Sequence, residues 1–169
     1  MVIRPAFPAD AQAIAEVHVA SWQRAYRDII PDDWLASQTV EKRRALWEQI
    51  LADPAQTTLV SEADHGIVGW TNYGPSRDED LDRARVVELN GIYVVAGHWD
   101  RGLGRMLWLE VLNRIRAGPA EAIVLWVFTA NARARRFYEN AGFAPDGITK
   151  IIRRGRQEIP AVRYRRNLP

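Results

Sequence analysis

Apolar residues in the first third of the chain recur at the spacing of amphipathic helices. A short strand is expected over 2–4, and Pro8 and Asp10 suit the first turn of the helix that follows. Pro31 interrupts the pattern, and a further helix is expected over 40–52. The apolar face of the first helix comprises Ile14, Val17, Ser21, Trp22 and Ala25.

After residue 56 the period changes to that of β-strands. Residues 57–63 and 66–73 are expected to form a hairpin that turns at Asp64-His65-Gly66. The run 85–95 is β-branched and apolar, but it contains Asn90-Gly91, which is by itself a type I′ turn signal. Either two short strands or one strand with a bulge at the glycine fits this run.

The second half of the chain alternates helices and strands. Residues 122–128 are continuously apolar, which predicts a strand covered on both faces. A helix is expected over 131–141, followed by strands near 148–153 and 161–165. The helix before them, which Gly118-Pro119 stops, has an inner stripe of Leu103, Leu107, Trp108, Val111, Leu112 and Ile115. This order of elements predicts a mixed α/β sheet flanked by helices.

Composition favours one domain over residues 1–169 and excludes several kinds of chemistry. With 47% apolar and 26% charged residues, 169 residues suffice to bury a core. No secretory signal or membrane-length apolar run is visible, so a cytoplasmic location is expected. The absence of cysteine excludes disulfides, thiolate metal ligands and a cysteine nucleophile. His18, His65 and His98 are scattered, so no metal site is expected.

The net charge is only +2, but arginines concentrate in the last seventeen residues. We interpret this run as a solvated face on two terminal strands, because charge runs usually have that role. The alternative is a nearby acidic or nucleic-acid acceptor, which is the weaker hypothesis. The arginines concerned are Arg153, Arg154, Arg156, Arg163, Arg165 and Arg166.

A glycine-containing loop between the run 85–95 and the next helix is suited to a phosphate. Gly102 and Gly104 let the backbone approach an anion, and the first N–H groups of a helix lack internal partners. A lone Gly-x-Gly is weak evidence. No Gly-Lys-Ser/Thr is present, and Leu107 stands where a dinucleotide fingerprint needs its third glycine.

A second segment, about thirty residues after the loop, narrows the choice of phosphate ligand. It reads Asn131-Ala132-Arg133-Ala134-Arg135-Arg136-Phe137-Tyr138-Glu139-Asn140-Ala141-Gly142-Phe143, and with the loop it closely resembles the acetyl-CoA site of the GNAT acetyltransferases. The resemblance reaches back to Ile3-Arg4-Pro5 and covers nearly the whole chain. It implies an N-acetyltransferase that uses acetyl-CoA, with a mostly antiparallel seven-stranded sheet. It also implies that 85–95 is one strand, bulged near Gly91 so that a slot for acetyl-CoA opens beside it.

The resemblance also implies which residues bind acetyl-CoA. The pyrophosphate would be bound by N–H groups of Asp100, Arg101, Gly102, Leu103, Gly104 and Arg105. Trp99 stands where many members carry Gln or Arg, a departure of small effect because the loop binds mainly through its backbone. The pantetheine arm would lie beside Ile92, Tyr93 and Val94, and the Val94 N–H would polarise the thioester carbonyl. Asn131 would contact the cofactor, although the position also suits a helix N-cap.

Two further residues are candidates for proton transfer. Tyr138 would return a proton to the departing thiolate; its alternative is a half-buried helix tyrosine. Glu88 is the candidate base, because strand alternation would place it on one face with Val86, Asn90 and Ile92. A salt bridge to an arginine such as Arg85 is an equally good interpretation of Glu88. Some relatives that modify peptide N-termini carry an acid where Trp126 stands here, so their mechanism does not transfer directly.

Four aromatic residues, Trp22, Tyr26, Trp34 and Tyr73, are candidate walls of the acceptor pocket, although Trp22 also fits a core position. The expected acceptor is a small amine: an amino acid analogue, a polyamine or an amino-bearing antibiotic. The alternatives are a protein N-terminus or lysine, and a non-catalytic acyl-CoA-binding module. Relatives are often dimers, and the C-terminal strand, expected at an exposed edge, would be the pairing surface of a homodimer.

Overall fold

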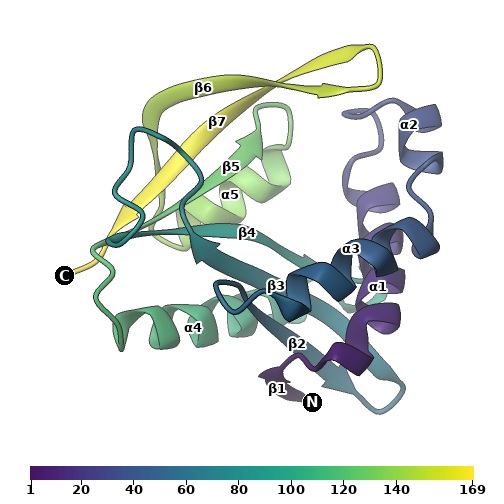
Figure 1. Ribbon diagram of the computed structural model, residues 1–169. Coiled ribbons are helices and arrows are strands. Elements are labelled where there is room, and N and C mark those ends of the chain that lie inside the picture. Colours follow the sequence, from purple (N-terminus) through teal and green to yellow (C-terminus); the bar gives the residue numbers. More distant parts are fainter.

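The computed structural model describes residues 1–169, which form seven strands, five α-helices and two short 3₁₀ turns (Figure 1). In chain order they are β1 (Val2–Pro5), η1 (Pro8–Asp10), α1 (Ala11–Ala25), α2 (Asp32–Ala36), α3 (Val40–Ala52), β2 (Thr57–Ala63), β3 (Gly66–Pro75), β4 (Val86–Val94), η2 (Ala96–His98), α4 (Leu103–Arg116), β5 (Ala122–Phe128), α5 (Ala132–Asn140), β6 (Ala144–Arg154) and β7 (Gln157–Asn167). None of these helices is long and apolar enough to span a membrane.

The strands form one sheet in the order β1-β2-β3-β4-β5-β7-β6. Every neighbouring pair is antiparallel except β4 and β5, which run parallel. α1 and α3 pack together on one face, around Trp47 and Trp70 (Figure 1). α4 and α5 cover the other face, where Trp108, Val111 and Tyr138 belong to the largest hydrophobic cluster. The predicted mixed α/β fold with a seven-stranded sheet is confirmed.

Helix α4 shows how directly the apolar spacing determines packing. All six residues of its predicted inner stripe, from Leu103 to Ile115, are buried. Burying a large aliphatic or aromatic side chain contributes roughly 1.5–3 kcal/mol relative to leaving it exposed. Gly102 begins this helix with a positive φ of 79°, a conformation that glycine adopts without steric cost. The stripe therefore fixes α4, and with it the loop that precedes the helix.

Strand β4 is continuous and carries a bulge, as the family resemblance implies. Asn72 of β3 pairs with Gly91, but the next residue, Tyr73, pairs with Leu89, so Asn90 is the extra residue. Leu89 and Ile92, three positions apart, consequently pack against the same cluster. A Cβ atom on residue 91 would lie 2.4 Å from the Tyr93 ring, so glycine is what admits that ring.

The bulge corrects the predicted alternation around Glu88. Simple alternation places Glu88 and Ile92 on one face. In the structure the inserted Asn90 reverses the pattern, so Ile92 packs against the cluster under α4, whereas Glu88 and Tyr93 lie on the opposite face of β4. Tyr93 therefore shares a face with Glu88, and the prediction that Ile92 does so is wrong.

Strands β4 and β5 pair over only three residues and then separate. The parallel ladder joins residues 86–88 to 122–124 and ends at the pair Glu88 and Val124. β4 continues to Val94 and β5 continues to Phe128. The edge of β4 beyond Glu88 thus has no strand beside it, which opens a slot in the middle of the sheet.

The C-terminal hairpin is longer than predicted, and its strand order differs from the expectation. β7 lies between β5 and β6, so the edge of the sheet is β6 and not the C-terminal strand. The proposed pairing of an exposed C-terminal strand with a second copy is therefore wrong. The expectation of a homodimer rests on the family resemblance alone.

Arg163 on β7 does not belong to a solvated face. Its side chain is only 4% exposed and contacts three carboxylates, those of Asp78 (3.1 Å), Asp80 (2.7 Å) and Asp146 (2.6 Å). Asp78 also accepts a hydrogen bond from the Trp126 indole. Arg163 therefore ties the 76–85 loop to β5, β6 and β7, and the interpretation of the arginine run as wholly solvated is wrong here.

Replacing Arg163 with methionine should destabilise the protein strongly. The substitution leaves three carboxylates close together without their cation, and breaking a buried ion pair typically costs about 3–5 kcal/mol. Arg153→Met is the matched control, since Arg153 is 78% exposed and its pair with Glu158 should contribute at most about 1 kcal/mol. Urea unfolding of both variants measures the difference. Equal unfolding free energies would contradict a structural role for the Arg163 cluster.

Candidate active site

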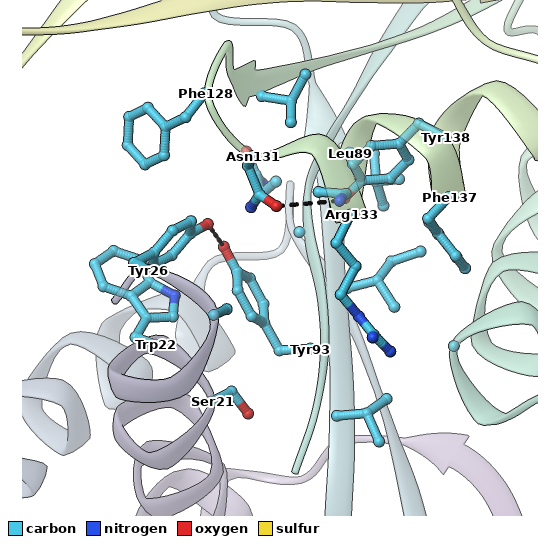
Figure 2. Close-up of a pocket in the computed structure, with 18 of the residues that line it drawn as sticks. Ser21, Trp22, Tyr26, Leu89, Tyr93, Phe128, Asn131, Arg133, Phe137 and Tyr138 are labelled. Carbon is cyan, nitrogen blue, oxygen red and sulfur yellow. Dashed lines mark hydrogen bonds between the residues drawn. The ribbon is translucent and has the colours of Figure 1, made fainter. Parts of the chain in front are cut away.

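A large cavity lies where β4 and β5 separate. It has a volume of about 1020 Å³ and is lined by residues 88–94 and 126–128, with contributions from α1, α5, β6 and the loop before α4. In Figure 2, Trp22 of α1 and Tyr26, which caps the C-terminus of α1, gather beside Tyr93, whereas Phe137 and Tyr138 project from α5. The cavity therefore joins an aromatic end to the glycine-containing loop.

The loop at residues 100–105 presents unused backbone donors. None of these six residues donates its N–H to another group of the protein. Asp100 and Gly102 have positive φ values of 59° and 79°, which shape the turn into α4. The predicted loop residues other than Arg101 line the cavity. A concave run of backbone N–H groups at a helix N-terminus is suited to a phosphate or pyrophosphate.

Trp99 and Arg133 meet beside this loop. The Trp99 indole donates to the Val94 carbonyl at 2.6 Å, and the Arg133 guanidinium lies 4.3 Å from the Trp99 ring centroid. Arg133 also pairs with Asp100 at 3.0 Å. The sequence interpretation missed Arg133, although it belongs to the quoted motif two residues after Asn131. Arg133 lies in the first turn of α5 and so brings a cation to the loop in which Trp99 replaces the Gln or Arg of many family members.

The edge of β4 exposes backbone groups to the slot. The Val95 N–H donates to the Val68 carbonyl at 2.9 Å, so that pair is hydrogen-bonded. Because an antiparallel ladder alternates, the N–H groups of Val94 and Ile92 point away from β3, toward the side where β5 has separated. These are the two N–H groups that an extended ligand in the slot could bind.

Tyr138 and Asn131 lie on α5 beside that edge. Tyr138 is 9% exposed and lines the cavity. Burial raises the pKa of its phenol above the usual range, and the nearby Ile92 backbone amide partly opposes this shift in pKa. The phenol is therefore protonated at neutral pH. Asn131 is the N-cap of α5, accepting the Ala134 N–H at 3.1 Å through its side-chain oxygen, and it also lines the cavity.

Glu88 is held by an arginine. It is 3% exposed and accepts from the Arg77 guanidinium at 2.5 and 3.0 Å, and from the Arg77 backbone N–H at 3.0 Å. Burial alone would raise the pKa of Glu88, but the Arg77 bonds hold that pKa below its ordinary value. The salt bridge was predicted, but with Arg85 as the example of a partner; Arg85 instead pairs with Glu121 at 2.6 Å.

The aromatic end of the cavity contains two of the four predicted wall residues. Trp22 and Tyr26 line it, and the hydroxyls of Tyr26 and Tyr93 are 2.5 Å apart (Figure 2). Trp34 does not line the cavity but stacks on Trp22 with ring centroids 5.9 Å apart. Phe128 completes this end and was missed, because a continuously apolar strand gives no sign of which residue borders a cavity.

The prediction that Tyr73 walls the pocket is wrong. Tyr73 pairs with Leu89 and packs with Leu59 and Trp108 in the cluster under α4, on the opposite face of the sheet. Alternation along β3 places Asn72 on the cavity side and Tyr73 away from it. The position of Tyr73 before a loop suggested a site, but the face of the strand decides otherwise.

Three further cations, from two segments of the chain, also line the cavity, and the sequence interpretation did not include them in the site. Arg77 lies in the loop before β4, and Lys150 and Arg154 lie on β6. Lys150 lies 3.8 Å from the Trp126 ring centroid, and burial lowers its pKa. Arg154 belonged to the run interpreted as a solvated face. Lys150 and Arg154 reach the cavity because β6 is long and lies beside β7.

His18 lies in the aromatic cluster beneath the site. It is 5% exposed, and its Nδ1 accepts from the Trp47 indole at 3.1 Å. Burial, with a smaller contribution from the charge of Arg43, lowers the pKa of His18 to about 3. His18 is therefore a neutral acceptor at physiological pH.

The protein should consequently become less stable as the pH is lowered through the range in which an unfolded histidine becomes protonated. The folded His18 has a pKa of about 3, against an ordinary value of 6.5, so the unfolded chain binds more protons below pH 6.5. The His18 contribution is fully present above pH 6.5, and about 2 kcal/mol of it should be lost between pH 7 and pH 5.

Urea unfolding at the two pH values measures this loss. In His18→Asn, where the side-chain oxygen keeps an acceptor for Trp47, the drop in unfolding free energy should be smaller by that amount. His65→Asn, at an exposed position, is the control. An unchanged pH dependence in His18→Asn would refute the assignment.

Comparisons with known proteins agree with this geometry. Residues 19–143 match the model of the Acetyltransferase (GNAT) family. The chain is similar to a probable N-acetyltransferase of Mycobacterium tuberculosis, with 28% identity over 87% of this chain and 82% of that protein. It is also similar to the L-methionine sulfoximine/L-methionine sulfone acetyltransferase of Salmonella typhimurium, with 28% identity over 85% of this chain and 80% of that protein.

The fold is similar to that of the PaiA N-acetyltransferase from Thermoplasma acidophilum, whose crystal structure contains coenzyme A. The TM-score is 0.77 and the sequence identity 19%, over 99% of this chain and 98% of that chain. At this identity the likeness is one of fold.

Proposed function

This chain belongs to the GNAT family of acetyltransferases and uses acetyl-CoA as its co-substrate, and we propose that it acetylates a small primary amine. The observation that carries this proposal is a single cavity that joins the loop at 100–105, with its unused N–H groups, to the Tyr138 phenol and an aromatic end. A walled cavity suits a small acceptor, whereas a protein terminus or a lysine on a protein needs an open groove. The similarity to a methionine sulfone acetyltransferase supports the same acceptor class.

We propose that three parts of the chain bind acetyl-CoA. The N–H groups of residues 100–105 bind the pyrophosphate, and Arg133 brings a cation to the place where Trp99 stands instead of Gln or Arg. The edge of β4 from Ile92 through Tyr93 to Val94 binds the pantetheine arm as an added strand would. The Asn131 amide nitrogen binds a cofactor carbonyl while its oxygen caps α5.

In the proposed reaction the amine attacks the thioester directly. The cofactor supplies an activated acetyl group; a C–N bond forms at its carbonyl carbon and the C–S bond breaks. The Val94 N–H stabilises the negative charge that develops on the carbonyl oxygen. Tyr138 gives its phenolic proton to the departing thiolate, and the proton that the newly acylated nitrogen loses passes through water to restore the phenol. No covalent enzyme intermediate is needed.

We propose that Glu88 assists the loss of a proton from the ammonium form of the acceptor. The Arg77 salt bridge lowers the pKa of Glu88, so the carboxylate is ionised at neutral pH and is a weak base. Its negative charge attracts the ammonium group into the cavity, and a water molecule beside it relays the proton to solvent. This role needs Glu88 to share its oxygens between Arg77 and the acceptor.

The first test of the proposed function is binding followed by turnover. Acetyl-CoA at 100 times its dissociation constant should stabilise the protein by about 2.7 kcal/mol, raising its melting temperature by several degrees. L-methionine sulfone, spermidine and a short peptide with a free N-terminus are then compared by release of free CoA thiol; the chain has no cysteine to interfere. The sulfone should be acetylated fastest. A melting-temperature rise with no turnover on any amine would favour a non-catalytic acyl-CoA-binding module, and a faster reaction with the peptide would overturn the small-molecule assignment.

Replacing Tyr138 with phenylalanine should lower kcat by roughly 10- to 1000-fold with little change in acetyl-CoA affinity, because only the proton donor is lost. Tyr73→Phe, which removes a hydroxyl outside the cavity, is the matched control and should keep full activity. Steady-state kinetics and a thermal-shift titration with acetyl-CoA separate turnover from binding. An unchanged kcat in Tyr138→Phe would remove the general-acid role.

A further inference from the structure

Two arginines and two tryptophans form a stack at the aromatic end of the cavity. Arg43 of α3 lies 4.6 Å from the Trp22 ring centroid, and Arg154 of β6 lies 5.0 Å from the Trp34 ring centroid. Trp22 and Trp34 stack on each other with centroids 5.9 Å apart and planes inclined by 26°. Each of the two stacked tryptophans therefore has a guanidinium over its ring.

Neither arginine of this stack has an acidic partner. Arg43 bonds only to the amide oxygen of Gln38, and Arg154 bonds only to the backbone carbonyl of Arg153 at 3.0 Å. The Arg154 Nε is buried and has no hydrogen-bond partner. Arg163, also on the C-terminal hairpin, contacts three carboxylates. An arginine that is partly buried without any anion therefore stands apart from the ion-paired arginines around it.

Burial and the mutual repulsion of the two arginines both disfavour their charged forms in the absence of an anion. Burial lowers the pKa of both Arg43 and Arg154, and the positive charge of Arg154 lowers the pKa of Arg43 further. Two like charges held in a partly buried place repel each other, and a bound anion would relieve that repulsion. A guanidinium offers parallel N–H donors that match the two oxygens of a carboxylate.

Arg154 lines the same cavity as Trp22 and Tyr26. It lies over Trp34 and so belongs to the aromatic end, whereas the N–H groups proposed for the pyrophosphate precede α4. An anion at Arg154 is therefore part of the acceptor and not of the cofactor. The two neighbouring lining carboxylates, Glu88 and Asp78, are engaged by Arg77 and Arg163.

We propose that Arg154, assisted by the charge of Arg43, binds a carboxylate of the acceptor, so that the acceptor is an amino acid and not a simple amine. This inference rests on the proposed function, because it specifies the acceptor of the same site. Binding of the carboxylate at Arg154 anchors one end of the acceptor at the aromatic wall and leaves its amino group to be directed toward Glu88 and the thioester.

The test uses two acceptors that differ only in the carboxylate, L-methionine sulfone and 3-(methylsulfonyl)propylamine. The wild-type protein should have a KM for the amino acid at least about tenfold below that for the amine. Arg154→Gln should raise the KM for the amino acid by about 10- to 100-fold, the effect of losing a charge-assisted hydrogen bond. The same variant should change the KM for the amine, and for acetyl-CoA, by less than threefold.

Two control variants assign the effect to Arg154. Arg153→Gln removes an exposed arginine from the adjacent position of β6 and should leave every KM unchanged. Lys150→Gln removes the other β6 cation that lines the cavity; a larger KM effect there than in Arg154→Gln would overturn the assignment. Equal KM values for the two acceptors in the wild type would also overturn it. A raised KM for acetyl-CoA in Arg154→Gln would assign this arginine to the cofactor instead.

A binding measurement separates failure of this inference from failure of the proposed function. If neither compound is acetylated, the proposed acceptor class is wrong, and the anion site is tested with N-acetyl-L-methionine sulfone and its counterpart without the carboxylate. Tryptophan fluorescence reports binding, since Trp22 lines this end of the cavity. The carboxylate compound should quench the wild type and bind Arg154→Gln at least tenfold more weakly. Equal titrations with both compounds would overturn the carboxylate site.

Discussion

The separation of β4 from β5 is the constraint on which the rest of the site depends. Two parallel strands normally satisfy each other's backbone groups, but here the ladder ends at Glu88 and Val124. The N–H groups of Ile92 and Val94 are left facing a slot, where a ligand with amide groups of its own can satisfy them. The same separation opens the cavity that brings α1, α5 and β6 around one space.

Holding this slot open needs support from both sides. On the β4 side, the extra residue Asn90 and the absence of a side chain at Gly91 turn the Tyr93 ring into the aromatic cluster. On the β5 side, Arg163 ties the 76–85 loop to the C-terminal hairpin through three carboxylates. The walls of the cavity are therefore positioned by packing and by a buried ionic cluster, and not by the ligand.

Charge is distributed unevenly around the cavity, and its distribution follows the proposed chemistry. Glu88 and Asp78 are neutralised by arginines, while Arg154 and Lys150 have no acidic partner within salt-bridge distance. Partly buried cations without anions are unfavourable in the free protein and become favourable when an anionic ligand binds. The acceptor end thus favours a substrate that carries a negative group as well as an amine.

The sequence by itself determined the features that depend on local spacing. The helical stripe of α4, the apolar strand β5, the hairpin of β2 and β3, and the loop-and-helix motif around Gly102 and Tyr138 all follow from periods of a few residues or from short motifs. The prediction that β4 is one strand needed the family resemblance, because Asn90-Gly91 by itself is a turn signal.

Only the tertiary structure decided the pairings between distant segments. The partner of Glu88 is Arg77 and not Arg85, Tyr73 faces α4, and Arg163 and Arg154 have opposite environments although both belong to one arginine run. Each of these outcomes depends on the register of a bulged strand or on the crossing of β6 and β7 beside the cavity. Local periodicity carries no information about such contacts, because they join residues that only the folded sheet brings together.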